Sequence, residues 1–285
     1  MTQGYRFELL ELTQDELRRT SELLRIVFPG AKYLTQRYLD WQYVQNPDGR
    51  AVGCNAWLGD ELVGHMSATP LRAKMDGSDV RGIFTVQGAV HPAHRGKKLQ
   101  SGISHAIFED AARQGYAFCF ATGNKYSTGP LLTRFRMVAP LDARIGYGVP
   151  QRREEVFEPG FQRVWSDEAM RWRLANPERP YRIGGEGDAL TITAPTGKPG
   201  VGAVLYSGRD AWNLPRRGAD LPGHGPLKVW IGLDPAVDWA KSSYVSIPMR
   251  LRPSPLNLVF KDFTGGNLHP DAVRTVWRTI DFDPY

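Results

Sequence analysis

The sequence predicts a mixed α/β protein, and three observations carry this prediction. Residues 51–90 contain strand-like segments separated by two turn signals, which is typical of antiparallel strands joined by tight turns. Residues 95–115 then change to a helical period, with apolar side chains recurring on one face. The run YAFCFAT at 116–122 is short, apolar and uninterrupted, as in a strand buried on both faces.

The N-terminal segments predict one strand and two helices. YRFELLEL, at residues 5–12, alternates enough for a first strand. Thr13 followed by Glu16 is a capping box, so we expect a helix that ends near Pro29. YLTQRYLDWQYVQ, at residues 33–45, predicts a second, aromatic-rich helix that stops before an Asn-Pro pair.

Strand, long helix and buried strand together form a crossover unit. The strands around Val90 and Phe118 are therefore predicted to be parallel. The next stretch, STGPLLTRFRMV at 127–138, predicts a further helix.

A sequence pattern recurs in the second part of the chain. YLDWQYVQNP ends at Pro47 and AMRWRLANP ends at Pro177, with tryptophan-to-asparagine spacings that differ by one residue. Strand-like segments follow each copy, among them VGCNAWLG in the first and VGAVLYSG in the second, and further strands are predicted at LKVWIGL, YVSIPMRL and LNLVF. We therefore predict two halves, residues 1–150 and residues 151–285, of which the second is a shorter, divergent copy.

Composition narrows the class of protein and of ligand. The chain has 285 residues, a net charge of +6 and an isoelectric point near 9.3, which favours acidic ligands such as nucleotides or phosphates. No apolar run is long enough for a membrane helix, and the N-terminus shows no signal pattern, so we expect no membrane partner and a cytoplasmic protein. Cys54 and Cys119 lie in apolar segments, which predicts buried free thiols.

The stretch VHPAHRGKKLQSG, at residues 90–102, has the form of a phosphate-binding turn. A strand that leads into a helix presents free backbone N–H groups and the positive end of the helix dipole at one point. An anion bound there gains from both, and the basic residues of the turn add charge. A solvated basic turn that opens an ordinary helix remains the alternative interpretation.

This stretch resembles the signature of the GCN5-related N-acetyltransferases. In that family a strand ends in Val-x-Pro, and Q/R-x-x-G-x-G/A then opens the helix that binds the diphosphate of acetyl-coenzyme A. Val90 and Pro92 match the first part and Arg95 the second, whereas Lys98 and Gln100 replace both signature glycines. We expect Lys98 to adopt ordinary helical angles, which tolerate a side chain, and Gln100 to narrow the approach to the helix.

The resemblance covers roughly residues 5–140 in the order of elements. It implies a mixed sheet with a splayed parallel strand pair, followed here by a degenerate second half of the same kind. The cofactor-binding residues that it implies are Val90, Arg95, Gly96, Lys97, Lys98, Leu99, Gln100, Asn124 and Ser127.

The resemblance also implies catalytic positions. The residue that often serves as base lies three positions before the Val-x-Pro valine, where this chain has Gln87. An amide cannot accept a proton at neutral pH, although it can orient an amine or hold a water. Possible substitutes nearby in the sequence are His65, Glu61 and His91, and Tyr126 is the candidate acid for the leaving thiolate.

No metal site is predicted, because His91 and His94 have no cysteine or acidic partner at ligand spacing in the sequence.

The resemblance implies an N-acyltransferase that moves an acetyl group from acetyl-coenzyme A to the amine of a small metabolite or an amino sugar by direct attack. Two alternatives stay open. One is an aminoacyl transferase of the two-copy type that uses charged transfer RNA; the other is a non-catalytic coenzyme A sensor, consistent with Gln87. We expect no nucleic-acid partner for the main hypothesis, and the sequence does not predict the oligomeric state.

Overall fold

The computed structural model describes residues 4–155, 157–185, 188–209, 211–219, 225–252 and 254–282. The elements of its first part, in chain order, are β1 (Tyr5–Leu9), α1 (Gln14–Val27), α2 (Gln36–Tyr43), β2 (Val52–Leu58), β3 (Glu61–Met75), β4 (Ser78–Val90), the short 3₁₀ helix η1 (Pro92–His94), α3 (Leu99–Arg113), β5 (Phe118–Gly123), α4 (Thr128–Leu131), β6 (Arg136–Pro140) and β7 (Asp142–Tyr147). Those of the second part are β8 (Phe161–Val164), α5 (Asp167–Leu174), β9 (Arg182–Gly184), β10 (Ala189–Pro195), β11 (Val201–Arg209), β12 (Leu227–Leu233), β13 (Tyr244–Ser246), η2 (Met249–Leu251), β14 (Asn257–Asp262), η3 (Ala272–Arg274), β15 (Thr275–Arg278) and α6 (Thr279–Phe282).

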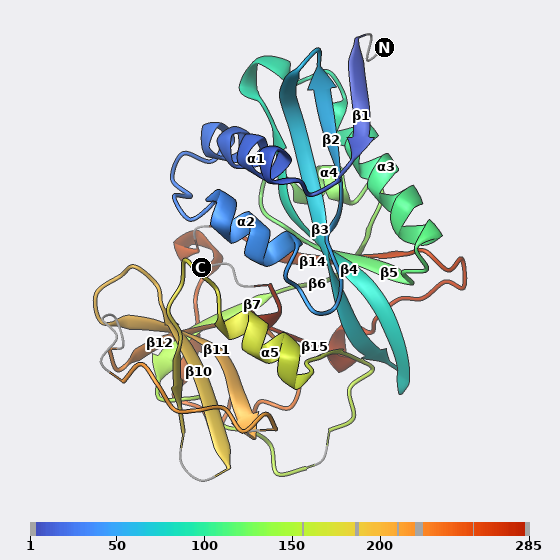
Figure 1. Ribbon diagram of the computed structural model, residues 1–285. Helices are drawn as coiled ribbons and strands as arrows, with labels where there is room; N and C mark the ends of the chain where they lie inside the picture. Colours follow the sequence, from blue (N-terminus) through green and yellow to red (C-terminus); the bar gives the residue numbers. More distant parts are fainter. Residues whose placement is uncertain are drawn as a thin grey trace.

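The strands form one mixed sheet that runs through both parts of the molecule (Figure 1). Its main path is β6-β14-β5-β4-β3-β8-β15-β12-β11-β10-β9, and β1 joins it through β2. β3 connects the two parts: its first half pairs with β2, and its last residues, Arg72–Met75, pair with β8. The mixed α/β fold class predicted from the sequence is confirmed.

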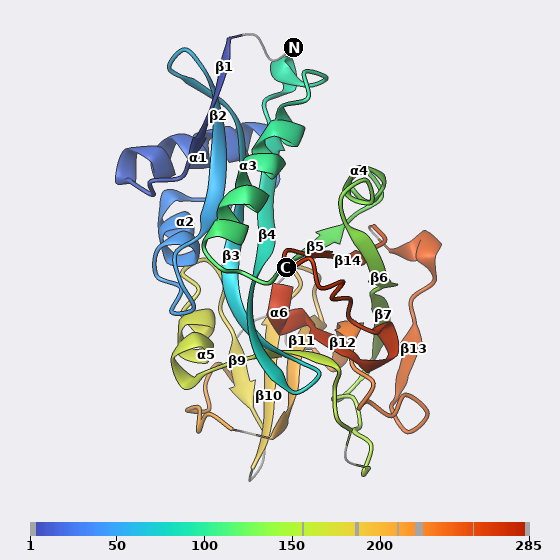
Figure 2. The same cartoon turned by 90° about the vertical axis from the view of Figure 1, so that its right-hand side faces the viewer.

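Helices cover both faces of the first part of the sheet (Figure 2). α3 packs its apolar stripe, including Leu99, Ile103 and Ile107, against residues of β2 and β3. α1 and α2 pack on the other face in a separate apolar cluster. The Thr13 hydroxyl accepts a hydrogen bond from the Glu16 N–H, so the predicted N-cap is confirmed, although the Glu16 carboxylate turns to other amides.

A third apolar cluster lies where the two parts meet. It combines Phe118 and Phe120 of β5 with Phe161, Phe260 and Trp277 of the second part, all fully buried. The aromatic rings contact one another, with the centroids of Phe120 and Trp277 5.0 Å apart. This cluster therefore joins segments that are far apart in the sequence.

Two segments differ from the sequence-based expectation. The predicted helix at 127–138 is confirmed only as the single turn α4, because residues 136–140 form β6 and pair with β14. The predicted strand YVSIPMRL stops at Ser246, since Pro248 has no N–H to donate to a ladder and η2 follows.

The recurring Asn-Pro helices lie side by side as α2 and α5 (Figure 1). Each has eight residues and a hydroxyl N-cap. Trp41 and Trp172 stack with ring centroids 4.9 Å apart, and each indole N–H donates to the other residue's backbone carbonyl, at 3.0 and 2.9 Å. After the helices, Asn46 and Asn176 each accept a hydrogen bond from the backbone N–H two residues on.

Within the described residues, no helix is long and apolar enough to cross a membrane.

Candidate functional site

The parallel strands β4 and β5 pair over only three positions before they separate. Gly82 to Phe84 pair with Phe118 to Phe120, and no further pairing follows toward the carboxyl ends. Gly82 allows this close pairing, because a Cβ at that position would meet the Phe118 ring. The splayed parallel pair predicted from the sequence is thus confirmed.

A cavity of about 680 Å³ opens where the strands separate. Thr85 to Gly88 line it from β4, and Ala121 and Thr122 line it from β5. α3 and α4 stand on either side of the diverging strands (Figure 2). Phe28 and Tyr33, from the segment between α1 and α2, also line it.

The turn between β4 and α3 is built on two residues with positive φ. Gly96 has φ +78° and Lys98, which is the N-cap of α3, has φ +58° and ψ +19°. The expectation of ordinary helical angles at Lys98 is therefore wrong. The signature glycine is replaced at a position that does require left-handed backbone, and a lysine there carries a strain of about 1 kcal/mol.

The amides at the start of α3 are available to a ligand. In the described part of the chain, the N–H groups of residues 96–100 make no hydrogen bond to another protein group. The Lys98 side chain makes no cap hydrogen bond to α3, so the cap residue does not occupy these N–H groups. Free N–H groups and the helix dipole together favour an anion at this point.

Gln100 and Leu99 point in different directions. The Gln100 side chain lines the cavity, and its amide nitrogen lies 3.1 Å from the Met66 sulfur, so it narrows the space beside α3 as expected. Leu99 is 2% exposed and packs in the core, which leaves only its backbone amide for a ligand. Val90 likewise packs against the core and does not line the cavity.

Asn124 and Ser127 line the cavity from the loop between β5 and α4. The Asn124 side-chain oxygen accepts hydrogen bonds from the Tyr126 N–H and the Ser127 N–H, at 2.9 and 3.0 Å, which orders the loop. The Tyr126 side chain is 77% exposed and lies outside the lining. Of the two catalytic candidates, therefore, the structure places Gln87 at the cavity and the Tyr126 side chain on the exposed surface of the loop, outside the lining.

Gln87 lies in a β-bulge. Ser67 pairs with Val86 and His65 with Ala89, so two residues of β4, Gln87 and Gly88, oppose one residue of β3. Gln87 has φ +46°, a strained conformation for a residue with a side chain. The bulge interrupts the ladder beside the cavity, and pairing resumes at Ala89.

The side chain of Gln87 is held by two neighbours. Its amide oxygen accepts a hydrogen bond from the Tyr43 hydroxyl at 2.9 Å, and its amide nitrogen donates to the Gln42 side-chain oxygen at 2.8 Å. The same Tyr43 hydroxyl lies 3.1 Å from Nε2 of His65. Gln42 and Gln87 line the cavity, whereas Tyr43 and His65 are fully buried behind them.

This network continues away from the cavity to helix α1. Nδ1 of His65 lies 2.7 Å from the Asn55 side-chain oxygen, and the Asn55 amide donates to Glu16 at 2.7 Å. The other Glu16 oxygen accepts from the backbone N–H groups of Leu12 and Glu11. A continuous chain of hydrogen bonds therefore joins the cavity to a half-buried carboxylate.

Burial keeps the centre of this network neutral. Desolvation lowers the pKa of His65 to about 3, since the charged imidazolium would be buried. Desolvation also raises the pKa of Tyr43 and that of Glu16. His65, a possible substitute base in the sequence, is therefore a neutral hydrogen-bonding group that does not reach the cavity.

Charge in the cavity comes from a residue that the sequence analysis missed. Arg134 lines the cavity and its guanidinium donates to the Ser101 hydroxyl in the first turn of α3. The sequence analysis assigned its segment to a helix and gave a role to Ser127 but none to Arg134. Among the described lining residues, none is an aspartate, glutamate, histidine, lysine or cysteine.

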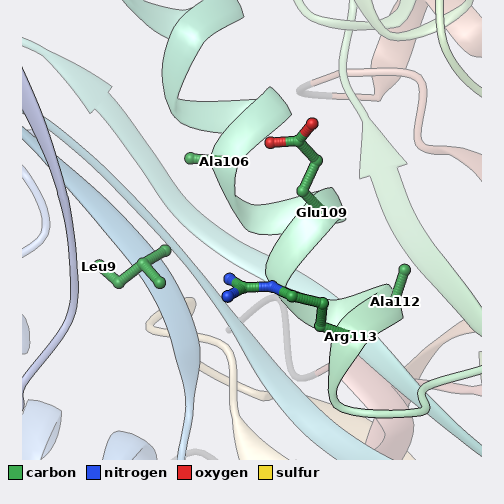
Figure 3. A pocket seen from close by; sticks show the side chains of 5 residues that line it. All are labelled: Leu9, Ala106, Glu109, Ala112 and Arg113. Carbon is green, nitrogen blue, oxygen red and sulfur yellow. The ribbon is translucent and has the colours of Figure 1, made fainter.

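A second, shallow hollow of about 740 Å³ lies on another side of α3 (Figure 3). Leu9 of β1 faces Ala106, Glu109 and Arg113 across it. None of the residues predicted as cofactor-binding or catalytic lines this hollow. We therefore take the cavity between β4 and β5 as the candidate functional site.

Both cysteines are buried free thiols, as predicted. Desolvation raises the pKa of the Cys54 thiol to about 12 and raises that of Cys119 as well. Neither is a nucleophile at neutral pH.

Comparisons with known proteins give a family match for part of the chain and a shared fold for most of it. The acetyltransferase (GNAT) domain family matches residues 8–135. Searching the curated proteins returned no match. Among solved structures, a probable N-acyltransferase from Enterococcus faecalis superposes with a TM-score of 0.62 at 11% identity, covering 91% of this chain and 73% of that one.

Two further structures superpose with a TM-score of 0.57 at 11% identity. Eis1 from Mycobacterium abscessus matches 91% of this chain and 74% of its own. N-myristoyltransferase from Saccharomyces cerevisiae, solved with bound myristoyl-CoA and inhibitors, matches 91% of this chain and 80% of its own. At these identities the likeness shows the fold. Residues 8–135 are therefore similar to the acetyltransferase (GNAT) domain family, and the chain shares its fold with these structures.

Proposed function

We propose that this protein is an N-acyltransferase that moves an acetyl group from acetyl-coenzyme A to the amine of a small molecule. The observation that carries the proposal is the cavity between β4 and β5, which Gln100 lines, together with the free amides of residues 96–100 at the start of α3. These amides and Arg134 supply donors and positive charge for a diphosphate. Arg95, Lys97 and Lys98 add positive charge on the turn itself.

The lining of the cavity favours a particular kind of acceptor. An acceptor with several ammonium groups, such as a polyamino sugar, would need carboxylates to compensate its charge, and the described lining contains none. Phe28, Tyr33 and Tyr38 instead offer apolar and aromatic surface. Of the two acceptor classes expected from the sequence, we therefore favour a small metabolite with one amine and an apolar body.

Gln87 is our candidate for holding the acceptor amine. Its amide lies at the cavity wall and is fixed on both sides by Tyr43 and Gln42. An amide can orient an amine but cannot take its proton, so the amine would enter as the free base or give its proton to water. For Tyr126 to protonate the leaving thiolate, its loop would have to turn the ring inward from its exposed position.

We further propose that residues 1–150 and 151–285 are two related halves. The reciprocal Trp41–Trp172 contact supports this, and so do the matching Asn46 and Asn176 turns. The two buried thiols fit a reducing compartment such as the cytoplasm.

A non-catalytic sensor of coenzyme A is the second candidate. The observation in its favour is that no group with a proton-accepting side chain near neutral pH is found among the described lining residues. A sensor needs the diphosphate site but no base.

Two measurements test these proposals together. Calorimetry with acetyl-coenzyme A would compare the parent with Lys98→Gly and Lys98→Glu. We expect Lys98→Gly to bind slightly more weakly, because it loses one positive charge, and Lys98→Glu to bind about tenfold more weakly, because it reverses that charge. Glycine relieves the left-handed strain with and without ligand, so Lys98→Gly should raise stability and not affinity. Thiol release would then be followed with a panel of amines.

Each outcome separates the candidates. Binding with amine-dependent thiol release supports the enzyme, whereas binding with no release for any amine supports the sensor. No binding of acetyl-coenzyme A by the parent would contradict both. Salt-dependent binding of transfer RNA in its place would favour the aminoacyl-transfer alternative.

A further inference from the structure

We propose that Glu61, His91 and His94 form a binding site for a divalent transition-metal ion of the zinc type. One ligand atom from each of these side chains lies within 4.8 Å of the other two. The sequence analysis predicted no metal site, because it found no acidic partner near the two histidines. The fold supplies that partner from a strand thirty positions earlier.

Strand pairing and a short helix bring the three residues together. Gly64 pairs with Val90, and the N–H of His91 donates to the Val63 carbonyl at 2.8 Å, so β3 and β4 remain paired beyond the bulge to the end of β4. Glu61, at the start of β3, therefore lies beside η1. In a 3₁₀ helix, side chains three residues apart lie on the same side, which places His91 and His94 together with ring centroids 5.6 Å apart.

The distances suit an ion after small side-chain movements. Zinc binds imidazole nitrogen at about 2.0 Å and carboxylate oxygen at about 2.1 Å, so tetrahedral ligands lie roughly 3.3 Å from one another. Glu61 is exposed, and rotation of its side chain can shorten the present separation. In the described structure its carboxylate forms no ion pair with either imidazole, so the three groups do not already satisfy one another.

The surroundings of His94 orient it as a ligand. Its Nδ1 lies 3.0 Å from the Tyr5 hydroxyl, and this hydrogen bond leaves Nε2 for an ion. Histidines that bind metals commonly have the second ring nitrogen held in this way. His91 makes a weaker contact, since its Nδ1 accepts from the Ala93 N–H at 3.3 Å. An ion on Nδ1 would replace that one long hydrogen bond. An ion on Nε2 would move the ring proton to Nδ1, which could then no longer accept from the Ala93 N–H.

The ligand set selects the kind of ion. Two imidazoles and one carboxylate suit Zn²⁺, Co²⁺ or Ni²⁺, whereas Mg²⁺ and Ca²⁺ prefer oxygen ligands alone. Three protein ligands leave at least one coordination position for water or another ligand. The nearby cation Lys97 is directed at the Tyr5 ring, with its Nζ 5.7 Å from the ring centroid.

The position of the site gives an ion a structural effect. η1 ends at His94, and the turn that carries the free amides begins at the next residue, Arg95. An ion bound to β3 and to both ends of η1 would fix the start of that turn. The site does not depend on the proposed transfer reaction.

Calorimetry with Zn²⁺ alone tests the proposal on the full chain, freed of any affinity tag and of bound metal by a chelator. We expect one ion per chain in the parent, and the visible absorption of a tetrahedral ion when Co²⁺ is used instead. His91→Ala and His94→Ala should each weaken binding about tenfold or more. Tyr5→Phe should weaken it by a smaller factor.

His105→Ala is the matched control. His105 lies 3.2 Å from the Glu109 carboxylate on α3, so it is an exposed histidine–glutamate pair with no third ligand described beside it. We expect this variant to bind Zn²⁺ as the parent does. No binding by the parent, unchanged affinity in His91→Ala, or an equal loss in His105→Ala would overturn the proposal. Thermal unfolding without metal checks that each variant is folded.

Discussion

Two residues beside the cavity carry side chains in left-handed backbone, Gln87 at the bulge of β4 and Lys98 at the N-cap of α3. Such conformations cost about 1 kcal/mol or more and persist only where the surrounding structure fixes them. Here the hydrogen bonds of Gln87 to Tyr43 and Gln42 supply that support on one side. Strain of this kind is common at binding sites, which agrees with the placement of the cavity.

His65 gives a prediction for stability against pH. Its pKa is about 3 in the folded chain, while an unfolded histidine has a pKa near 6.5. Between these values the unfolded chain binds a proton that the native state does not. The free energy of unfolding should therefore fall as pH decreases through this window, by up to about 1.4 kcal/mol per pH unit from this residue.

In the His65→Gln variant, the free energy of unfolding should decrease less steeply as the pH is lowered, although the variant should be less stable than the parent at neutral pH. Urea unfolding of the parent and of His65→Gln at several pH values across the window measures the difference. Glu16, whose raised pKa acts in the opposite direction, is present in both proteins. His105→Gln, at an exposed position, serves as control. Parallel curves for the parent and His65→Gln would contradict the assignment.

Sequence patterns that extend over a few neighbouring residues predict some of the site residues and not others. The segment from Val90 to Gln100 was found because its signals lie within a few residues of one another. The conformation of Lys98 could not be predicted, since a lysine gives no sign of positive φ. The partners of Gln87 come from α2, and its bulge becomes visible only when the strands are paired.

At the scale of elements, α2 and α5 make equivalent contacts. Trp41 is 3% exposed, and its indole fills the space between the helices while bonding to the Trp172 carbonyl. Trp41→Ala removes this volume and also takes away the ring on which Trp172 stacks. We expect a loss of about 3 kcal/mol in the free energy of unfolding, measured by denaturant titration.

Trp57 offers a comparison for that measurement. It is only half-buried, and its indole nitrogen has no partner among the described residues. Trp57→Ala should cost clearly less than Trp41→Ala. An equal cost would show that the α2–α5 contact has no special weight in stability.

Hydrophobic periodicity in the sequence predicts some of these elements correctly and others wrongly. The helices α1, α2 and α3 were predictable because each has a cap or an apolar stripe within its own sequence. β6 was assigned to a helix because its strand partner, β14, comes from residues 257–262, more than a hundred positions later. Pairing over such distances leaves no local signal in the sequence.

For the whole molecule, the two proposed halves share their core and their sheet. β14 lies between β5 and β6, and Phe118 and Phe120 of β5 pack against Phe260 and Trp277. A fragment of residues 1–150 would therefore lose the strand between β5 and β6 and expose these rings. We expect it to show no cooperative thermal transition by circular dichroism, in contrast to the full chain.

A sharp transition and a monomeric elution volume for residues 1–150 would contradict this expectation. They would show that the first half folds alone and that the shared aromatic cluster is dispensable. The fragment experiment tests stability only. The proposed relation between the two halves rests on the contacts of α2 and α5.

The paired tryptophans have one more consequence. Each gives its indole hydrogen to the other's main chain, so the contact is self-complementary, as interfaces across a two-fold axis are. A chain that carried only one of these helices would present a surface able to meet an identical molecule.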